Sequence, residues 1–139
     1  MTPALPAWYA QKPVATVADL GTGAKWVPFV FTPDDVAAFR RATGAEPGGS
    51  TPQGVIPLIG RFAYLGVHRA PPGGVLARLT WRNVSAMPTD GRALVRSEVV
   101  DDFEKRGRRR IVIDTDIVHV DRRPIATVSW ELVWPEGAE

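Results

Sequence analysis

The chain has 139 residues, 45% of them hydrophobic, which is the size and composition of one domain with a substantial core. It contains no cysteine, so disulfides, thiolate metal sites and a catalytic cysteine are excluded. The formal net charge is only +2, from 17 Lys and Arg against 15 Asp and Glu, and this balance does not indicate a protein that binds nucleic acid.

The N-terminal segment carries no recognisable export signal. It lacks the basic start and apolar core of a signal peptide, and the chain nowhere contains the run of about 18 apolar residues that a membrane-spanning helix needs. We therefore expect a cytoplasmic protein that does not enter a membrane. Residues 1–24 are rich in Pro, Ala, Gly and Thr, which predicts an irregular arm on the surface, anchored by Trp8 and Tyr9.

A strand and a capped helix follow this arm. Residues 25–31 have the composition of a strand, and Pro28 within them indicates an edge strand or a bulge. Thr32 is a suitable N-cap with a proline directly after it, and Asp35 stands at capping-box spacing. Gly44 is a typical helix stop. The pattern therefore predicts a short amphipathic helix between Thr32 and Gly44.

Residues 54–68 predict a second helix that is apolar on most of its surface. Pro57 fits its first turn, where a missing N–H has no consequence. Apolar residues form one stripe and its flanks: Val55, Leu58, Ile59, Phe62 and Gly66, with Ile56, Ala63 and Leu65 beside them. A helix that is apolar nearly all round is normally buried, so we expect this one at the centre of the fold.

Strand-like runs occupy the rest of the chain. Apolar and polar residues alternate with a period of two, as in a half-buried antiparallel sheet. The runs cover residues 75–84, 92–101, 110–120 and 125–134. The predicted fold class is therefore α+β, with a single domain over residues 25–139 in which a curved antiparallel sheet wraps around a central hydrophobic helix.

Three stretches of the sequence, in this order, resemble a known family. Residues 31–39 with Gly44 are similar to its entry into the first helix, residues 54–57 to the start of its central helix, and residues 102–109 to a hairpin between two late strands. Together they resemble the hot-dog fold and, within it, the MaoC-like hydratase and dehydratase family. The likeness extends over residues 18–134.

The resemblance implies an acyl-thioester substrate, carried by coenzyme A or acyl carrier protein, and no cofactor. Family members add water to a trans-2-enoyl group or remove it from an (R)-3-hydroxyacyl group. An Asp and a His between the first and the central helix activate the water, and a Gly near the start of the central helix holds the thioester oxygen. The fold also implies a homodimer, or a heterodimer with a second hot-dog subunit.

The sequence departs from the family at the catalytic pair. Ala45 or Glu46 occupies the region of the family Asp, and no His occurs between Arg40 and Gln53. The chain therefore resembles those hot-dog halves that lack the pair and shape the acyl pocket beside an active half. Two alternatives stay open: a homodimer that binds a small apolar or acyl ligand without hydratase activity, and an enzyme with a substituted active site.

Three residues are candidates for a substituted catalytic site. Glu46 is either a lone carboxylate base or a solvated loop residue, and we favour the second interpretation. Tyr64 and His68 share the only polar stripe of the central helix with Arg61. This stripe is either a substituted active site or a patch facing a partner, and the alternative for His68 is a histidine favoured by the helix dipole. His119 is expected to have a structural role.

Substrate contacts are expected at two places. The first is the start and polar stripe of the central helix, where the predicted substrate-binding residues are Gly54, Val55, Ile56 and Arg61. Gly54 either offers its N–H to a thioester oxygen or is simply a loop glycine. The second is the basic run of residues 105–110, with Arg106 and Arg108 as candidates for contacting the phosphates of coenzyme A or an acidic carrier protein. The alternative is a solvated hairpin, and the aromatic residues of a nucleic-acid platform are lacking. No metal site is expected, because Asp114 and Asp116 have no nearby His.

Overall fold

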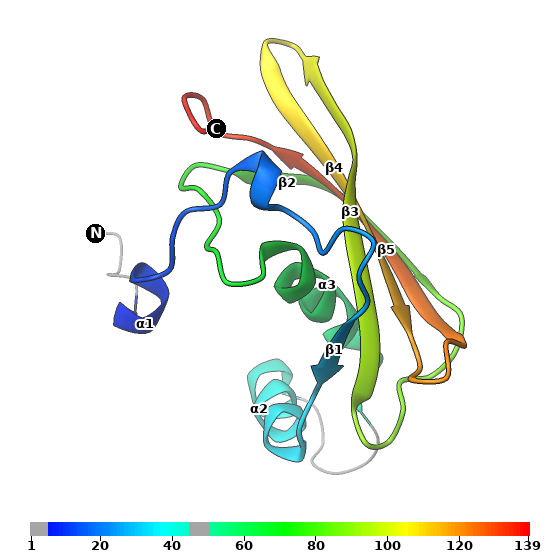
Figure 1. Cartoon of the computed structure of the whole chain (residues 1–139). Helices are drawn as coiled ribbons and strands as arrows, with labels where there is room; N and C mark the ends of the chain where they lie inside the picture. Colours follow the sequence, from blue (N-terminus) through cyan, green and yellow to red (C-terminus); the bar gives the residue numbers. More distant parts are fainter. Residues whose placement is uncertain (1–5, 45–50) are drawn as a thin grey trace.

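The structure, a computed structural model, describes residues 6–44 and 51–139. The helices are α1 (Ala7–Ala10), α2 (Pro33–Thr43) and α3 (Ile56–Leu65), with 3-10 turns at Val17–Asp19 and Gln53–Val55. The strands are β1 (Val27–Val30), β2 (Val75–Asn83), β3 (Arg92–Lys105), β4 (Arg108–Val118) and β5 (Pro124–Val133). They form one antiparallel sheet in the order β1-β3-β4-β5-β2, curved around α3 (Figure 1). The predicted α+β fold is confirmed.

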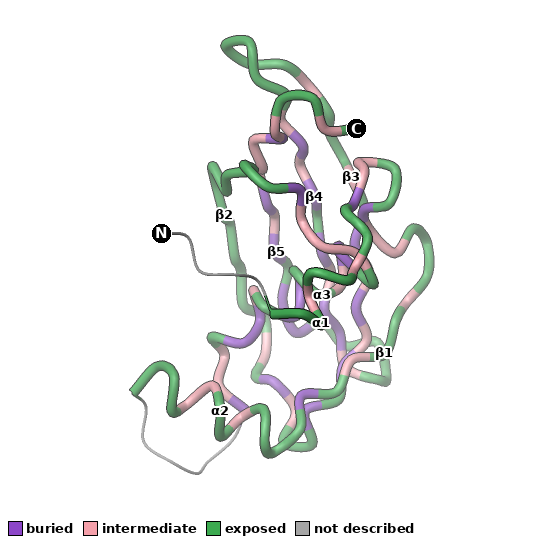
Figure 2. The backbone as a smooth tube through the Cα atoms, turned by 90° about the vertical axis from the view of Figure 1, so that its left-hand side faces the viewer, coloured by how far each residue is buried: buried purple, intermediate pink, exposed green. Residues whose placement is uncertain are grey.

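The core lies between α3 and the concave face of the three central strands. The residues of β3, β4 and β5 that point toward α3 are almost completely buried. Figure 2 marks buried positions along these three strands. They include Ala93, Val95, Ile111, Ile113, Ile117, Ala126, Val128 and Trp130. The alternation predicted for β5 is confirmed, because Ala126, Val128 and Trp130 are buried. At about 25 cal/mol per Å² of apolar surface, this layer is the main source of stability.

Helix α2 has the ends that its sequence predicts. The Thr32 side chain accepts a hydrogen bond from the Asp35 N–H at 3.2 Å, and the Asp35 carboxylate accepts one from the Thr32 N–H at 2.9 Å. Gly44 ends the helix in a left-handed conformation with φ of 71°. Because these contacts are local, the cap positions could be read from the sequence alone.

Helix α3 is shorter and less enclosed than the sequence predicts. It begins at Ile56 and ends at Leu65, so residues 66–68 lie outside it. Ile59 is completely buried, whereas Leu58 is 41% exposed and Phe62 57% exposed. The predicted stripe was therefore wrong in its orientation, because only one side of this mostly apolar helix faces the sheet. None of the helices in residues 6–44 and 51–139 is long and apolar enough to cross a membrane.

Strand β2 is an edge strand, and every residue in it is exposed. The prediction of a half-buried strand was therefore wrong for this segment, although its pairing with β5 is regular apart from an irregularity between Leu76 and Arg78. This shift moves Val75 to the opposite face from Leu79, which the simple alternation placed together with it. Strand β1 forms the other edge, as the proline in it indicated.

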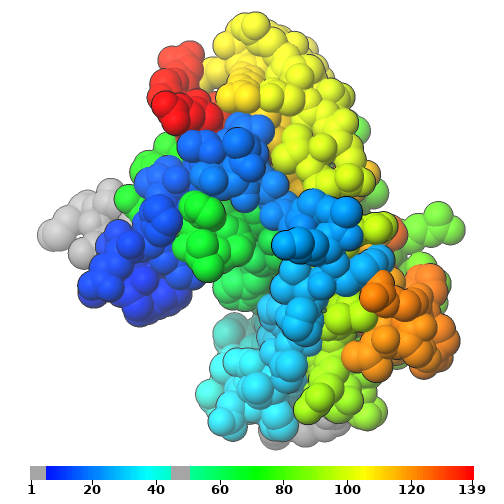
Figure 3. All heavy atoms as spheres, viewed as in Figure 1, coloured from blue at the N-terminus to red at the C-terminus, as the bar shows by residue number. Residues whose placement is uncertain are grey.

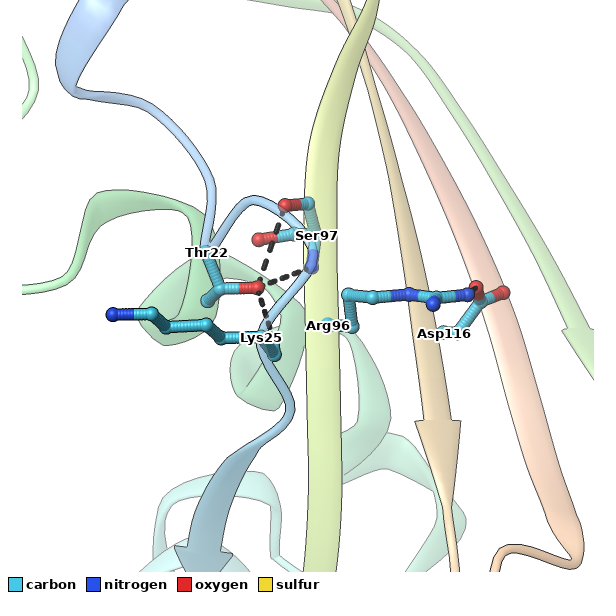
Figure 4. Close-up of polar contacts among 5 residues, drawn as sticks. All are labelled: Thr22, Lys25, Arg96, Ser97 and Asp116. Carbon is cyan, nitrogen blue, oxygen red and sulfur yellow. Dashed lines mark hydrogen bonds and ion pairs between the residues drawn. The ribbon is translucent and has the colours of Figure 1, made fainter.

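The N-terminal segment runs along the open side of α3 and is held to it and to β3 (Figure 3). The Gly21 N–H donates to the Tyr64 carbonyl oxygen at 2.9 Å, which ties the segment to α3. The Thr22 N–H donates to the Ser97 carbonyl oxygen at 2.8 Å, and the Thr22 hydroxyl accepts from the Ser97 N–H at 3.0 Å (Figure 4). Gly21 is required here, because it has φ of 91° and a Cβ on it would lie 2.7 Å from the Ser97 carbonyl oxygen.

Candidate functional site

A pocket of about 160 Å³ opens beside α3, between this helix and the β2–β5 side of the sheet. Its walls are mainly apolar, and its polar groups come from one side of the helix. The lining residues are Arg61, Tyr64 and Leu65 of α3, Ala70, Pro71, Gly74, Val75 and Leu76 of the following segment, and Trp130, Leu132, Val133 and Trp134 at the end of β5. An apolar pocket with few convergent polar groups is the usual form of a small-molecule site.

Tyr64 supplies the main polar group of this pocket. Its side chain is buried, and its ring meets Trp130 edge to face with the centroids 5.4 Å apart. Burial raises the pKa of the Tyr64 hydroxyl, while the positive charge of Arg61 and the hydrogen bond from Arg61 act in the opposite direction. At neutral pH the phenol is therefore protonated, and it can donate a hydrogen bond to a carbonyl oxygen.

Gly60 allows α3 to lie close to Trp130. A Cβ at Gly60 would lie 3.1 Å from the indole ring, so a larger residue would push the helix away from the sheet. The indole N–H of Trp130 is buried and has no hydrogen-bond partner in the described part of the chain. Sequence reasoning missed this pocket, although Trp130 and Trp134 on one face of a strand, with a glycine in the facing helix, were a usable signal.

The predicted polar stripe of α3 is only partly formed. Arg61 and Tyr64 contact each other at the pocket, but Tyr64 faces the core instead of an outer polar surface. His68 lies beyond the end of the helix and does not line the pocket. Its Nε2 lies 3.7 Å from a carboxylate oxygen of Asp19. The pKa of Asp19 is lowered mainly by hydrogen bonds from Thr16, with a smaller contribution from His68.

His119 connects two turns at the other end of the sheet. Its Nε2 lies 3.2 Å from the Ser85 hydroxyl, which donates a hydrogen bond to the Pro124 carbonyl oxygen at 2.7 Å. The Gln53 side chain donates to the Ser85 carbonyl oxygen at 3.3 Å, so Ser85 also holds the segment before α3. These contacts agree with the structural role expected for His119.

The start of α3 places the other predicted residues in different environments. Gly54 is exposed, and a Cβ on it would lie 3.1 Å from the Phe39 ring. Val55 and Ile56 are completely buried in the core. Glu46 lies outside the described residues. The substrate contacts expected at Gly54, Val55 and Ile56, and the catalytic role considered for Glu46, stay predictions.

The basic hairpin between β3 and β4 is largely neutralised by its own neighbours. Arg109 forms a two-point ion pair with Asp102, at 2.9 and 2.7 Å, and this hydrogen bonding lowers the pKa of the carboxyl group. Arg110 contacts Glu131 at 3.1 Å, and Arg108 lies 4.0 Å from Glu136. In the described part of the chain, the remaining cations of this run, Lys105 and Arg106, make no ion pair.

The hairpin and the pocket are adjacent. Trp134 lines the pocket beside α3 and also a hollow beside the hairpin. The backbone N–H of Trp134 donates to the Arg109 carbonyl oxygen at 2.8 Å. Arg106 is at the hairpin turn, with φ of 53°.

Within residues 6–44 and 51–139 no three potential metal ligands come together.

Comparison with known proteins identifies the fold. No family model and no curated protein matches the sequence. In structure, the chain is similar to a chain of the C-terminally truncated HadBC (3R-hydroxyacyl-ACP dehydratase) complex from Mycobacterium tuberculosis, with a TM-score of 0.65 and 12% identity over 81% of this chain and 92% of that one. It is also similar to full-length peroxisomal multifunctional enzyme type 2 from Drosophila melanogaster, with a TM-score of 0.64 and 13% identity over 80% of this chain and 23% of that one.

At these identities the likeness concerns the fold. The chain matches nearly the whole HadBC chain and about a quarter of the larger enzyme, as expected for one hot-dog unit. The arrangement predicted from residues 31–39, 54–57 and 102–109 is therefore found in a dehydratase complex. The chain has the hot-dog fold, of the type predicted from its resemblance to MaoC-like hydratases and dehydratases.

Proposed function

We propose that the chain is an accessory hot-dog subunit of an (R)-specific enoyl-thioester hydratase or 3-hydroxyacyl-thioester dehydratase, acting in the cytoplasm. It shapes the acyl pocket, while a second hot-dog subunit supplies the Asp and the His. The observation that carries this proposal is a hot-dog fold similar to a hydroxyacyl dehydratase chain, in a sequence that has no His between Arg40 and Gln53. The two histidines of the chain contact Asp19 and Ser85 instead.

The pocket beside α3 is suited to an acyl ligand, and a partner subunit would complete its walls. Trp130, Leu132 and Trp134 give it apolar walls, and Tyr64 supplies a hydrogen-bond donor for a thioester oxygen. Its volume of about 160 Å³ is below the roughly 300–1,000 Å³ of typical ligand sites. Because Val75 at the start of β2 also lines it, a subunit lying along β2 would extend its wall.

The thioester carrier fits the neighbouring hairpin. Lys105 and Arg106 are exposed and make no ion pair in the described part of the chain, so they are available to phosphates of coenzyme A or to an acidic carrier protein. Arg108, only 4.0 Å from Glu136, is a weaker anion ligand. The acyl part of such a substrate would lie along Trp134, which lines both hollows.

The surface proposed to contact the partner is the apolar inner face of β2. On β2, Leu76 is 47% exposed, Leu79 39% and Trp81 38%, all on the side of the sheet that carries α3. An exposed nine-residue edge strand with apolar side chains is a site for pairing with another chain. This surface supports a hot-dog partner, either a second copy or a different subunit.

The test is hydration of crotonyl-CoA by the purified chain alone. We expect no turnover above the uncatalysed rate, together with measurable binding of acyl-CoA by isothermal titration. Robust turnover by the lone protein would contradict the accessory role. If turnover then disappeared in Tyr64→Phe or His68→Ala, with the fold intact, the enzyme with a substituted active site would be the correct alternative.

A second candidate function is a homodimer that binds a small apolar or acyl ligand without hydratase chemistry. The observation that favours it is the apolar lining of the pocket, which needs no thioester. Titration with acyl-CoAs and with the corresponding free acids separates the two functions. Binding of the free acids without binding of any thioester would support this second candidate.

A further inference from the structure

The two faces of β2 differ sharply in chemistry. Leu79 and Trp81 lie opposite Trp130 and Val128 of β5, whose side chains are buried against α3. The side chains of Leu79 and Trp81 therefore extend the apolar inner layer of the sheet beyond its last strand. Figure 2 shows the whole of β2 exposed at this edge.

The outer face of β2 carries two exposed arginines, Arg78 and Arg82. Arg78 lies opposite Glu131 and Arg82 opposite Thr127. Glu131 is already bound to Arg110, at 3.1 Å. In the part of the chain that the structure describes, Arg78 and Arg82 form no ion pair, and both are exposed. Any strand that pairs with β2 therefore meets uncompensated positive charge.

A second copy of the chain would place like charges together. Two copies of one strand pair about a two-fold axis, so residues of the same face meet. With Leu79 at the axis, Arg78 lies opposite the second copy's Thr80 and diagonal to its Arg78 and Arg82. With Thr80 at the axis, Arg78 lies directly opposite Arg82 twice. Like charges across a strand pair are destabilising, and long side chains also reach diagonal neighbours.

We propose that β2 pairs with the edge strand of a different hot-dog subunit, one that carries Asp or Glu on its outer face opposite Arg78 and Arg82. This deepens the proposed function, on which it rests, by giving the partner a charge pattern and by excluding a second copy as the preferred partner. The apolar inner face supplies the affinity, and the two arginines on the outer face select between partners.

A charge-reversed copy of the chain is a suitable substitute for this partner. Mixing the wild type with Arg78→Glu/Arg82→Glu should give a 1:1 heterodimer in sedimentation velocity at low salt, while each protein alone remains largely monomeric. Native mass spectrometry with one protein isotopically labelled identifies the mixed species. We expect the mixed pair to associate at least about tenfold more tightly than either protein with itself. The difference should shrink at about 1 M salt, where the screening length is about 3 Å.

The matched control is Lys105→Glu/Arg106→Glu, which makes the same change in charge at the hairpin tip, away from β2. Its mixture with the wild type should not gain a heterodimer. A wild type that dimerises at low salt as tightly as the mixture would overturn the proposal, and so would a mixture that remains monomeric.

A neutral variant keeps the proposal testable if the charge-reversed protein does not fold. Arg78→Gln/Arg82→Gln removes the repulsion, so it should self-associate more tightly than the wild type, and unchanged association would overturn the proposal. None of these measurements uses turnover. A lone chain that hydrates crotonyl-CoA would therefore contradict the accessory role without affecting the choice of partner. Conversely, a wild type that dimerises with itself would contradict the choice of partner without affecting the accessory role.

Discussion

Replacing Gly91 by Ala should destabilise the protein more than the same change at Gly44. Both glycines have a left-handed backbone, with φ of 68° and 71°. At Gly44 nothing lies within 4 Å of the added Cβ, so only the backbone preference is lost, about 1–2 kcal/mol. At Gly91 the Cβ would overlap the carbonyl oxygen of Phe31, which follows β1 directly.

Relieving that overlap requires the backbone around Phe31 to move away from Gly91. The movement breaks the hydrogen bond from the Phe31 N–H to the Gly91 carbonyl oxygen, 2.9 Å long, which contributes about 0.5–1.5 kcal/mol. Added to the backbone term of about 1–2 kcal/mol, this gives an expected loss of about 1.5–3.5 kcal/mol for Gly91→Ala. For a chain of this size, that loss lowers Tm by about 10 °C, against about 5 °C for Gly44→Ala.

Urea unfolding followed by tryptophan fluorescence measures both variants on one scale, because the chain has five tryptophans. The slope of free energy against urea should be unchanged, which shows that the folded states are equally compact. Equal losses for the two variants would refute the close contact between Gly91 and Phe31 and, with it, the anchoring of β1 at this point.

Three further changes test other contacts. Thr32→Ala removes the cap of α2 and should lower the free energy of unfolding by about 1 kcal/mol in the same assay; no loss would contradict the cap. Because the pKa of folded Tyr64 is raised from 10.0, its contribution to the free energy of unfolding is present below pH 10.0 and is lost as pH rises through the folded value. Tyr64→Phe should therefore lack this alkaline loss of stability. An identical loss in the variant would contradict a buried phenol. Because the pKa of folded Asp102 is lowered from 3.8, its pairing with Arg109 stabilises the fold above that pH and is lost on acidification. The free energy of unfolding of Asp102→Asn should differ from that of the wild type by less than about 1 kcal/mol at neutral pH. The difference should vanish below pH 3.8.

The parts of the fold that depend on local contacts were predictable from the sequence. The cap at Thr32 and the stop at Gly44 involve neighbours three or four residues apart, and the alternation through Val128 and Trp130 follows from the two-residue period of a strand. The hot-dog arrangement followed from the order of these elements.

The failures occurred where the outcome depends on distant segments. The apolar pattern of α3 does not tell which side faces the sheet, and Leu58 and Phe62 were therefore placed inside when they are exposed. The alternation of β2 is the same for a central strand and for an edge strand. The pocket joins Tyr64 to Trp130 and Trp134 from the far end of the chain. The sequence indicates that the two tryptophans share one face of a strand, but it does not indicate that Tyr64 packs against that face.

The two borders of the sheet have unequal capacity for growth. β1 offers four residues, and one of them, Pro28, has no amide hydrogen to donate to a neighbour. β2 offers nine residues without a proline. Strand-to-strand assembly can therefore proceed at one border only, and it ends once that border is occupied. A molecule built in this way joins a pair and is protected from polymerising into an open-ended ribbon.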